Sequence, residues 1–389
     1  MTRVLFVSNG HGEAAIADRV ARDVRALLPD ARLDHLALVG DSRSERMLEV
    51  GPRRCMPSGG LIAMGNVKNV LRDLCAGLLG LVASQRRFLR AARGSYDASV
   101  AVGDAYALAM TLQARAPTVF VGTAKSVSVA PYGRFEERVL SRAAVRFVRD
   151  EPTAEALRAR GLTVEPAANT IVDLFSDDEP NADAAVRDFK PALALLPGSR
   201  LSAYADAGFL LTVLRELLPL HASLGAVLSV ARGLDPQRFA IDARRAGWDV
   251  RDESELVPFS LALQGRVTVR AWSGPLGPIF GRVSLVMGQA GTANEGAAAA
   301  GVPVVAFAAE REGASRWYRQ RQQGLLGDAL AVFPRRVPDA AAALAKLLDD
   351  PARRRQMSDA GRMRMGAPGA SARIARAVAA LASRCACVA

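Results

Sequence analysis

The sequence predicts an α/β protein made of two doubly wound parallel-sheet domains in tandem. The chain has 389 residues, enough for two domains of roughly 180–190 residues each. Short apolar strands and helical segments alternate along the first half, and the alternation starts again after a polar stretch at residues 176–191. Such alternation produces a parallel sheet with helices on both faces, and these folds bind ligands at the carboxyl ends of their strands.

The first domain, predicted over residues 1–180, begins with an apolar strand at residues 4–8 and a glycine-rich turn. Apolar residues recur with helical spacing after this turn. They are Ile16, Val20, Val24, Leu27 and Leu28. Further strands are expected at residues 33–39, 98–102, 118–121 and 145–148.

The second domain, predicted over residues 190–370, repeats the pattern after the polar linker. Its strands are expected at residues 193–196, 226–230, 267–269, 283–287 and 302–307. Helices are expected at residues 205–218, 340–348 and 371–382. Residues 371–389 are set apart from both domains as a C-terminal helix and tail.

The composition is basic, with a formal net charge of +12. Only four residues are lysines, so part of this charge reflects an arginine-rich composition. The rest would suit an anionic partner such as nucleic acid, phospholipid or a phosphorylated substrate. Aromatic residues make up only 5% of the chain, which argues against a stacking platform for single-stranded nucleic acid.

The cysteines Cys55, Cys75, Cys385 and Cys387 form no C-x-x-C pair and have no histidine at zinc-binding spacing. We therefore expect a reduced, cytoplasmic protein without a bound metal. The apolar run near the start is too short for a signal peptide. The best apolar stretch, at residues 74–83, is shorter than the roughly 20 residues that span a bilayer.

The turn SNGHGE (residues 8–13) joins the first strand to its helix. Its glycines would let backbone amides approach a ligand, and a helix N-terminus favours an anion. A tight turn without a ligand is the alternative. The turn fits neither G-x-G-x-x-G nor the P-loop, which argues against an NAD-dependent enzyme. His11 lies in this loop, whereas burial in the core is the simpler interpretation of His35 and His221.

Asp104 follows the strand at residues 98–102, within VGDAY. At the carboxyl end of a strand, its carboxylate could take a proton from a hydroxyl nucleophile. The simpler alternative is that Asp104 caps the next helix, which is a frequent role for aspartate at such a position.

Two motifs mark the second domain. LLPGSR (residues 195–200) ends its first strand at a Pro-Gly turn, and GQAGTANEGAAAAGVPVVAF (residues 288–307) runs from a strand into a helix of small residues. Backbone amides at such a helix N-terminus suit a diphosphate, and Glu295 in the first turns could accept hydrogen bonds from a ribose. A helix start with a dipole-favourable glutamate and no ligand is the alternative. We expect REGASRWYRQR (residues 311–321) near this site, together with Gln320, Gln322 and Gln323.

These segments carry a resemblance. SNGHGE, VGDAYAL, LLPGSR and GQAGTANEGAAAAGVPVVAF, in this order and spacing, resemble the lipid A disaccharide synthase family. They are more narrowly similar to its branch of lipid-A-disaccharide-synthase-related proteins, within the GT-B glycosyltransferases. The resemblance spans almost the whole chain. It implies two Rossmann-like domains facing a cleft, and an inverting, metal-independent transfer of a sugar of N-acetylglucosamine type from a UDP-sugar to a lipid or lipid-linked acceptor.

The resemblance also implies residue roles. Asp104 would be the base for the acceptor hydroxyl, with His11 as the alternative. Arg200 would contact the donor diphosphate and replace a divalent metal, and Glu295 would bind the ribose. The other donor-binding residues would be Gly198, Ser199, Gln289, Gly291, Thr292 and Ala293. The acceptor side would include Gly10, Gly12 and Glu13. No cofactor besides the UDP-sugar co-substrate is expected.

Residues 61–94 combine basic and apolar side chains. Their only acid is Asp73, and their basic residues are Lys68, Arg72, Arg86, Arg87, Arg90 and Arg93. A helix of this kind can lie in an anionic membrane surface, to which each basic residue adds about 1 kcal/mol. A core helix with a solvated basic end is the alternative. The family resembled handles lipid acceptors, so we expect a peripheral protein on the inner face of the cytoplasmic membrane.

Two alternatives stay open. The non-hydrolysing UDP-N-acetylglucosamine 2-epimerases share the architecture. They need further acidic and histidine residues in the cleft, and His35 and His221 are poorly placed to lie there. The charge would also suit a non-catalytic nucleotide-binding or nucleic-acid-binding protein, with a steep salt dependence of DNA binding. We expect no specific nucleic-acid partner and make no prediction of the oligomeric state.

Overall fold

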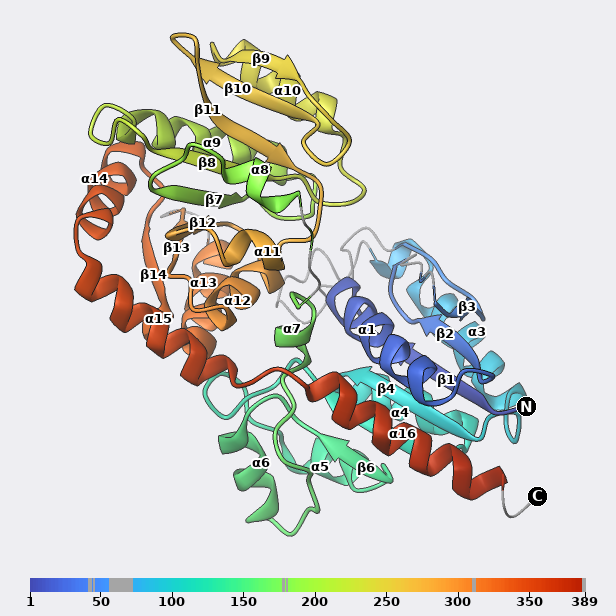
Figure 1. The fold of residues 1–389 in the computed structure, drawn as a ribbon. Helices are drawn as coiled ribbons and strands as arrows, with labels where there is room; N and C mark the ends of the chain where they lie inside the picture. Colours follow the sequence, from blue (N-terminus) through green and yellow to red (C-terminus); the bar gives the residue numbers. More distant parts are fainter. Residues whose placement is uncertain are drawn as a thin grey trace. The chain divides into compact units, whose positions relative to one another are not determined.

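The computed structural model describes residues 1–40, 44, 46–55, 73–176, 179, 181–309 and 313–386. These form two compact units, each with its own sheet (Figure 1). The first unit contains Met1–Leu174 and Ala367–Ala389, and the second contains Phe175–Gly366. Residues 371–389 were expected to form a separate helix and tail, but the helix in this segment belongs to the first unit.

The sheet of the first unit is parallel throughout. Its strands are β1 (Arg3–Ser8), β2 (Arg32–Ala37), β3 (Leu48–Glu49), β4 (Ala98–Gly103), β5 (Thr118–Gly122) and β6 (Val145–Phe147). They lie in the order β3-β2-β1-β4-β5-β6, which is the strand order of the Rossmann fold. The strands predicted in this unit are confirmed, with ends shifted by one or two residues. The short β3 leaves no pattern that a sequence could show.

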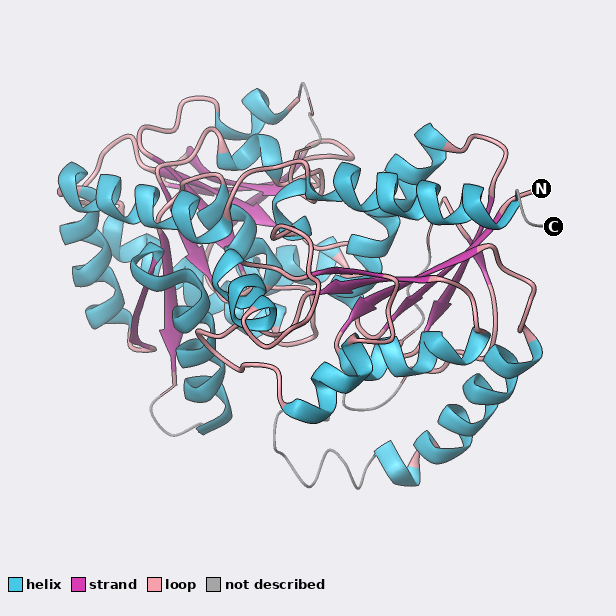
Figure 2. Cartoon of the chain, turned by 90° about the horizontal axis from the view of Figure 1, so that it is seen from below, coloured by secondary structure: helices cyan, strands magenta, loops and turns pink. Residues whose placement is uncertain are grey.

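Helices cover both faces of this sheet (Figure 2). They are α1 (His11–Leu27), α3 (Leu78–Ala91), α4 (Ala105–Thr111), α5 (Arg134–Leu140), α6 (Glu151–Arg158), α7 (Thr170–Asp173) and α16 (Ala370–Ala386). Every residue of β4 is buried, because a doubly wound sheet covers both faces of its central strands. The predicted fold class is confirmed for this unit.

The last helix, α16, packs along α1 and also contacts β4 (Figure 1). The buried carboxylate of Asp173 fixes its start, because Oδ1 accepts from the Gly369 amide at 2.6 Å and Oδ2 from the Ser371 amide at 2.7 Å. The carbonyl oxygen of Asp173 accepts a further hydrogen bond from Arg19 of α1, at 2.7 Å. The end of the chain is therefore an integral part of the first unit.

The second unit has a larger sheet. Its strands are β7 (Ala192–Leu196), β8 (Gly225–Ser229), β9 (Asp249–Asp252), β10 (Phe259–Leu263), β11 (Arg266–Trp272), β12 (Leu285–Gly288), β13 (Val304–Ala308) and β14 (Leu330–Pro334). They lie in the order β14-β13-β12-β7-β8-β11-β10-β9. All pairs are parallel except those that β10 forms with β9 and β11. Without the inserted β9 and β10, this is again the Rossmann order.

Helices flank this sheet as well. They are α8 (Ala182–Val186), α9 (Ala203–Leu217), α10 (Pro236–Arg245), α11 (Gly277–Phe280), α12 (Thr292–Ala299), α13 (Gly313–Leu326), α14 (Val337–Leu348) and α15 (Pro351–Met365). The strands and helices predicted in this unit are confirmed. β9, β10 and β14 were not predicted, and neither were the ranges of several helices, among them α10, α13 and α15. For β9 and α15 the reason is physical. β9 is an edge strand of mostly exposed residues, and α15 has only three buried residues, so neither carries an apolar stripe.

Each sheet has one topological switch point, where the order in which successive strands are added reverses. In the first unit, the chain proceeds from β1 to β2 and β3, and then returns to β4 on the other side of β1. In the second unit, β7 and β12 have the same relation. Ligands of open α/β sheets bind outside the carboxyl ends of the strands at such switch points. SNGHGE and VGDAY follow β1 and β4, and LLPGSR and GQAGT follow β7 and β12.

The segment 61–94 is described only in part, because residues 61–72 lie outside the described residues. Within its described part, α3 buries Leu81, Gln85 and Leu89. Leu79 is 71% exposed. Among the helices that the structure describes, none is long and apolar enough to cross a membrane.

Candidate functional site

The two motifs of the second unit lie side by side at the carboxyl ends of β7 and β12. Leu196 pairs with Gly288 in the sheet, and its carbonyl oxygen then accepts from the amides of Gln289 and Ala290, at 2.8 and 3.2 Å. Gly198 has a φ of 107°, a conformation that favours glycine. The structure therefore brings LLPGSR and GQAGT together in one place.

The N-terminus of α12 starts from this place with open donors. Within the described residues, the amides of Gly291, Thr292 and Ala293 donate no hydrogen bond. The first N–H groups of a helix have no partner inside the helix, and together with the helix dipole they attract an anion. α12 therefore presents three free peptide donors at the switch point of the sheet.

The carbonyl oxygens of the loop before α12 are bound to side chains of α12 and α13. Asn294 Nδ2 donates to the Gly288 oxygen at 3.2 Å, and Arg319 Nη2 donates to the Gln289 oxygen at 2.9 Å. Gln322 Nε2 donates to the oxygens of the next two residues, Ala290 and Gly291, at 3.1 and 3.2 Å. These bonds fix the peptide planes of residues 288–291.

Arg319 is the centre of this group. It is only 7% exposed, and burial lowers the pKa of its guanidinium. Its hydrogen bonds go to neutral groups, namely the Gln289 and Ala290 carbonyls and the side-chain oxygens of Gln289 and Gln322. It forms no ion pair with any residue that the structure describes. A buried cation is costly, and the acceptors on Nη1 and Nη2 offset this cost in part, since the buried Nε has no partner among the described residues.

The predicted donor-side residues differ in what their side chains do. Ser199 and Arg200 are exposed in the loop before α9, and Glu295 is half-buried in α12. The side chain of Gln289 is bound within the fold instead. Its Nε2 donates to the Phe307 carbonyl at 3.1 Å, and its Oε1 accepts from Arg319 at 2.5 Å.

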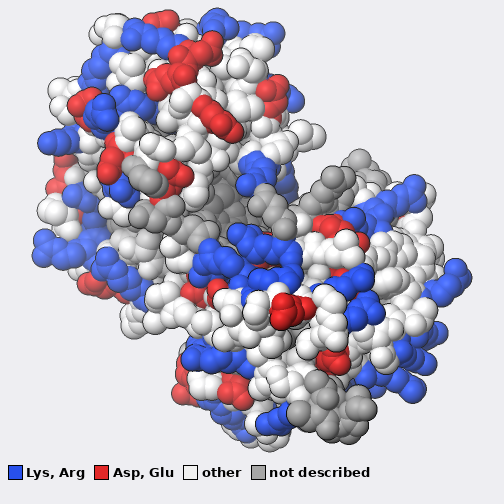
Figure 3. Space-filling view, turned by 45° about the vertical axis from the view of Figure 1, so that its right-hand side comes forward, with Lys and Arg blue, Asp and Glu red and all other residues white. Residues whose placement is uncertain are grey.

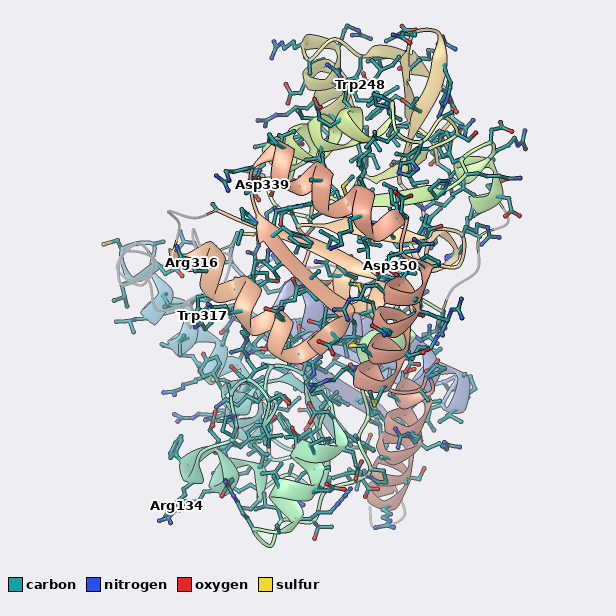
Figure 4. All side chains as sticks on the ribbon, turned by 90° about the vertical axis from the view of Figure 1, so that its left-hand side faces the viewer. Arg134, Trp248, Arg316, Trp317, Asp339 and Asp350 are labelled. Atoms are coloured by element: carbon teal, nitrogen blue, oxygen red, sulfur yellow. The ribbon has the colours of Figure 1, made fainter. Side chains whose placement is uncertain are left out.

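Asn294, Tyr318 and Arg319 were not singled out from the sequence, whereas Gln322 was expected near the donor site. The only signal was the expectation that residues 311–321 lie near the donor site. Figure 4 labels Arg316 and Trp317, their exposed neighbours on α13. Exposed and buried side chains alternate along this helix, so its composition alone does not distinguish them.

In the first unit, Asp104 follows β4 and caps α4. Its Oδ1 accepts from the amides of Tyr106 and Ala107, both at 3.0 Å. The capping alternative of the sequence analysis is thus observed, and a role as base stays a prediction. The preceding Gly103 has a φ of 137°, and the Asn9 side chain fills the place where its Cβ would stand. The ends of β1 and β4 are therefore packed directly against each other.

The acceptor-side residues gather at the same end of the first sheet. His11 is exposed at the start of α1, where its ring packs against Gly40. The Glu13 carboxylate lies against Gly10 and accepts from the Thr123 hydroxyl at 3.3 Å. Gly12, which lies between His11 and Glu13 in the sequence, is half-buried.

Of the other two histidines, His35 lies in the core as expected, whereas His221 is half-buried, so the expected core burial is wrong for His221. His35 is 1% exposed and lies 2.9 Å from the Ser8 hydroxyl. Burial, and next the charge of Arg53, lower its pKa to about 4, so His35 is neutral at physiological pH. His221 has a buried Nε2 without a hydrogen-bond partner among the described residues. Neither is placed for acid–base chemistry at the strand ends.

Across the described ranges, no group of three or more His, Cys, Asp or Glu side chains could hold a metal ion. Cys55 and Cys75 are exposed thiols without a disulfide.

Comparison with solved structures identifies the fold class. The chain is similar to the S. aureus protein MnaA in its UDP co-structure, at 13% identity and TM-score 0.59, over 96% of this chain and 95% of that one. It is also similar to a UDP-GlcNAc 2-epimerase from Neisseria meningitidis bound to UDP-GlcNAc, at 11% identity and TM-score 0.55, over 98% and 100%.

A glycosyltransferase shows the same similarity. A UDP-glucosyltransferase from Polygonum tinctorium matches at 12% identity and TM-score 0.57, over 98% of both chains. No protein-family model and no curated protein sequence matches the chain. At these identities the similarity shows the fold, and the chain has the two Rossmann-like units of the GT-B class.

Replacing Arg319 tests the role of α13 in holding the loop. We expect Arg319→Met to lower the free energy of unfolding by about 2–3 kcal/mol, because buried carbonyl oxygens of Gln289 and Ala290 lose their donors. Urea denaturation followed by circular dichroism measures the loss. Arg316→Met, at an exposed position of the same helix, is the matched control and should change stability by less than about 0.5 kcal/mol. Equal stability of the two variants would contradict the assignment.

Proposed function

We propose that the chain is a nucleotide-sugar-dependent glycosyltransferase whose donor diphosphate binds at the N-terminus of α12. One observation carries the proposal. The amides of Gly291, Thr292 and Ala293 are open, while the carbonyls of the preceding loop are held by other groups. Peptide N–H groups at a helix N-terminus suit a phosphate. The loop that carries Arg200 lies beside this helix start, at the switch point where ligands of this fold class bind.

In this proposal the second unit holds the donor. The open amides and the Arg200 guanidinium bind the diphosphate, and Glu295 accepts hydrogen bonds from the ribose hydroxyls. Gly198 and Ser199 let the backbone of the same loop come close to the phosphates. The diphosphate gains charge as its bond to the sugar breaks, so these donors stabilise the transition state more than the bound substrate. They take the role that a divalent metal has in other transferases.

The first unit then takes the acceptor and supplies the base. Asp104 or His11 removes the proton of the acceptor hydroxyl as its oxygen bonds to the anomeric carbon. The bond from this carbon to the diphosphate breaks on the opposite face, UDP leaves with the electron pair, and the configuration is inverted. Both cap hydrogen bonds of Asp104 end on Oδ1, which leaves Oδ2 to take the proton. Gly10, Gly12 and Glu13 line this side.

Two findings support the identity of the substrates. Structurally similar proteins hold UDP or UDP-GlcNAc, which favours a UDP-sugar of N-acetylglucosamine type as the donor. The four motifs that resemble the lipid A disaccharide synthase family favour a lipid or lipid-linked acceptor, and with it a role in building the bacterial cell envelope at the inner face of the cytoplasmic membrane.

The surface of α3 supports a lipid partner. Basic side chains gather in several groups on the surface (Figure 3). On α3, Arg86, Arg87 and Arg90 are exposed, and their spacing of three and four residues places them on one side of the helix. Leu79, one turn before Ala83 on the same side, is 71% exposed. We propose that this side of α3 rests on an anionic membrane.

A UDP-N-acetylglucosamine 2-epimerase is the second candidate, because several of the similar structures belong to that class. Such an enzyme would invert C2 of UDP-GlcNAc without an acceptor. Incubation of the protein with UDP-GlcNAc alone, followed by proton NMR of the sugar, distinguishes the two. Inversion at C2 favours the epimerase, and transfer that depends on an added lipid acceptor favours the transferase.

Isothermal titration of UDP, with and without EDTA, tests the donor site. We expect UDP to bind the wild type in both conditions, and Arg200→Ala and Glu295→Ala to weaken binding about tenfold or more. Arg251→Ala and Glu253→Ala, exposed at the edge of the same unit, are matched controls that should bind as the wild type. If UDP, UDP-GlcNAc and GDP-mannose all fail to bind while a DNA duplex binds, the nucleic-acid alternative is favoured instead.

The base is tested by Asp104→Asn, because asparagine caps a helix as well as aspartate but cannot take the proton. We expect unchanged UDP affinity and stability, and a loss of sugar transfer to lipid extract of about 10²–10⁴-fold. Transfer of the labelled sugar from UDP-GlcNAc is the measurement. Full turnover in Asp104→Asn with loss in His11→Gln would assign the base to His11, and full turnover in both would contradict the assignment.

Flotation with vesicles tests the membrane surface. We expect binding to phosphatidylglycerol vesicles and none to phosphatidylcholine vesicles. Replacing Arg86, Arg87 and Arg90 by alanine should weaken binding about a hundredfold, since each basic residue adds about 1 kcal/mol. An equal number of alanine replacements on the exposed arginines of α10, Arg238, Arg244 and Arg245, should leave it unchanged. If the two triple variants had equal effects, the protein would bind through its general positive charge, and a membrane-binding surface on α3 would be contradicted.

A further inference from the structure

The hydroxyl of Tyr318 lies at the start of α12. It stands against Gly291, in the place where a Cβ atom on that residue would be. Gly291 has φ and ψ of −94° and −88°, so no left-handed backbone requires glycine there. A side chain on residue 291 would therefore collide with the tyrosine hydroxyl unless Tyr318 moved.

This hydroxyl is available as a donor. Within the described part of the chain it makes no hydrogen bond. Burial, and next the charge of Glu295, raise the pKa of Tyr318, so the phenol is protonated at neutral pH. Arg200, Arg319 and Arg321 act on this pKa in the opposite direction, because positive charge surrounds the phenol.

Several groups around Gly291 are thus hydrogen-bond donors. They comprise the three open amides at the start of α12, the Tyr318 hydroxyl beside the first of them, and the Arg200 guanidinium on the loop after β7, the strand that pairs with β12. A ligand that matches them must offer several acceptor oxygens and negative charge in a small volume. A diphosphate meets this requirement.

We propose that Tyr318 is a further catalytic residue, whose hydroxyl donates a hydrogen bond to a phosphate oxygen of the nucleotide bound at the N-terminus of α12. The inference rests on the proposed function and adds a contact from α13 to it. The bond strengthens as the diphosphate gains charge on leaving the sugar. Arg319, the next residue, holds the loop from its carbonyl side, so one turn of α13 both fixes the loop and contacts the ligand.

Tyr318→Phe removes the hydroxyl and keeps the ring. We expect isothermal titration to show a loss of UDP affinity of roughly 10- to 100-fold, as for other hydrogen bonds to charged groups, with an unchanged melting temperature. Tyr132→Phe is the matched control, because the Tyr132 hydroxyl is also without a hydrogen-bond partner among the described residues but lies in the first unit. It should bind UDP as the wild type does.

Gly291→Ala tests the placement of the hydroxyl without any ligand. Its methyl group should collide with the hydroxyl and lower the melting temperature. In the Tyr318→Phe background the nearest ring carbon is 3.8 Å from the added Cβ, an ordinary van der Waals distance. The double variant should therefore recover most of the lost stability, and the absence of recovery would contradict the placement.

The outcomes separate this inference from the proposed function. If Tyr318→Phe and the wild type bind UDP equally, the role of Tyr318 is overturned and the donor site stands. If the wild type binds neither UDP nor inorganic pyrophosphate, both are overturned. A loss of affinity for UDP and for pyrophosphate in Tyr318→Phe, with neither lost in Tyr132→Phe, supports the hydroxyl–phosphate contact.

Discussion

The donor site depends on the hydrogen bonds that side chains of α13 donate to the loop between β12 and α12. Apart from Gln289, the loop of residues 288–291 carries no polar side chain that could bind its own carbonyl oxygens. Arg319 and Gln322 bind the carbonyl oxygens of residues 289–291 from outside. The amides at the helix start are open because the first N–H groups of a helix have no partner inside it. Arg319 is buried and forms no ion pair with a described residue, which is costly. Its Nη1 and Nη2 groups offset part of this cost by donating to several neutral acceptors of the loop and of Gln322.

The two units use the same strand order with different chemistry at the switch point. In both, the strand next to the first one ends in a glycine, Gly103 in β4 and Gly288 in β12, and an asparagine side chain packs where the Cβ would be. This packing lets the neighbouring loops come close together. Beyond it the units diverge, because the first presents titratable side chains, Asp104 and His11, whereas the second presents peptide amides and arginine. Such a division suits proton removal in one unit and phosphate binding in the other.

Most of the fold could be predicted from the sequence, because buried parallel strands are short apolar runs and their helices repeat apolar residues at helical spacing. The motifs after β1, β4, β7 and β12 could be placed on strand ends for the same reason. The role of α13 could not, since a hydrogen bond from a side chain to a distant carbonyl leaves no periodic pattern. Asp104 shows a second limit: an aspartate after a strand is equally suited to capping a helix and to taking a proton, and only the structure shows the cap.

A crystal structure of the protein with UDP bound tests the central claim most directly. The account predicts that phosphate oxygens lie within about 3.2 Å of the Gly291, Thr292 or Ala293 amides, with the Arg200 guanidinium on the same diphosphate. The loop carbonyls should still bind Arg319 and Gln322. UDP bound with its phosphates away from the start of α12, or a loop whose carbonyls turn toward the ligand, would contradict the account.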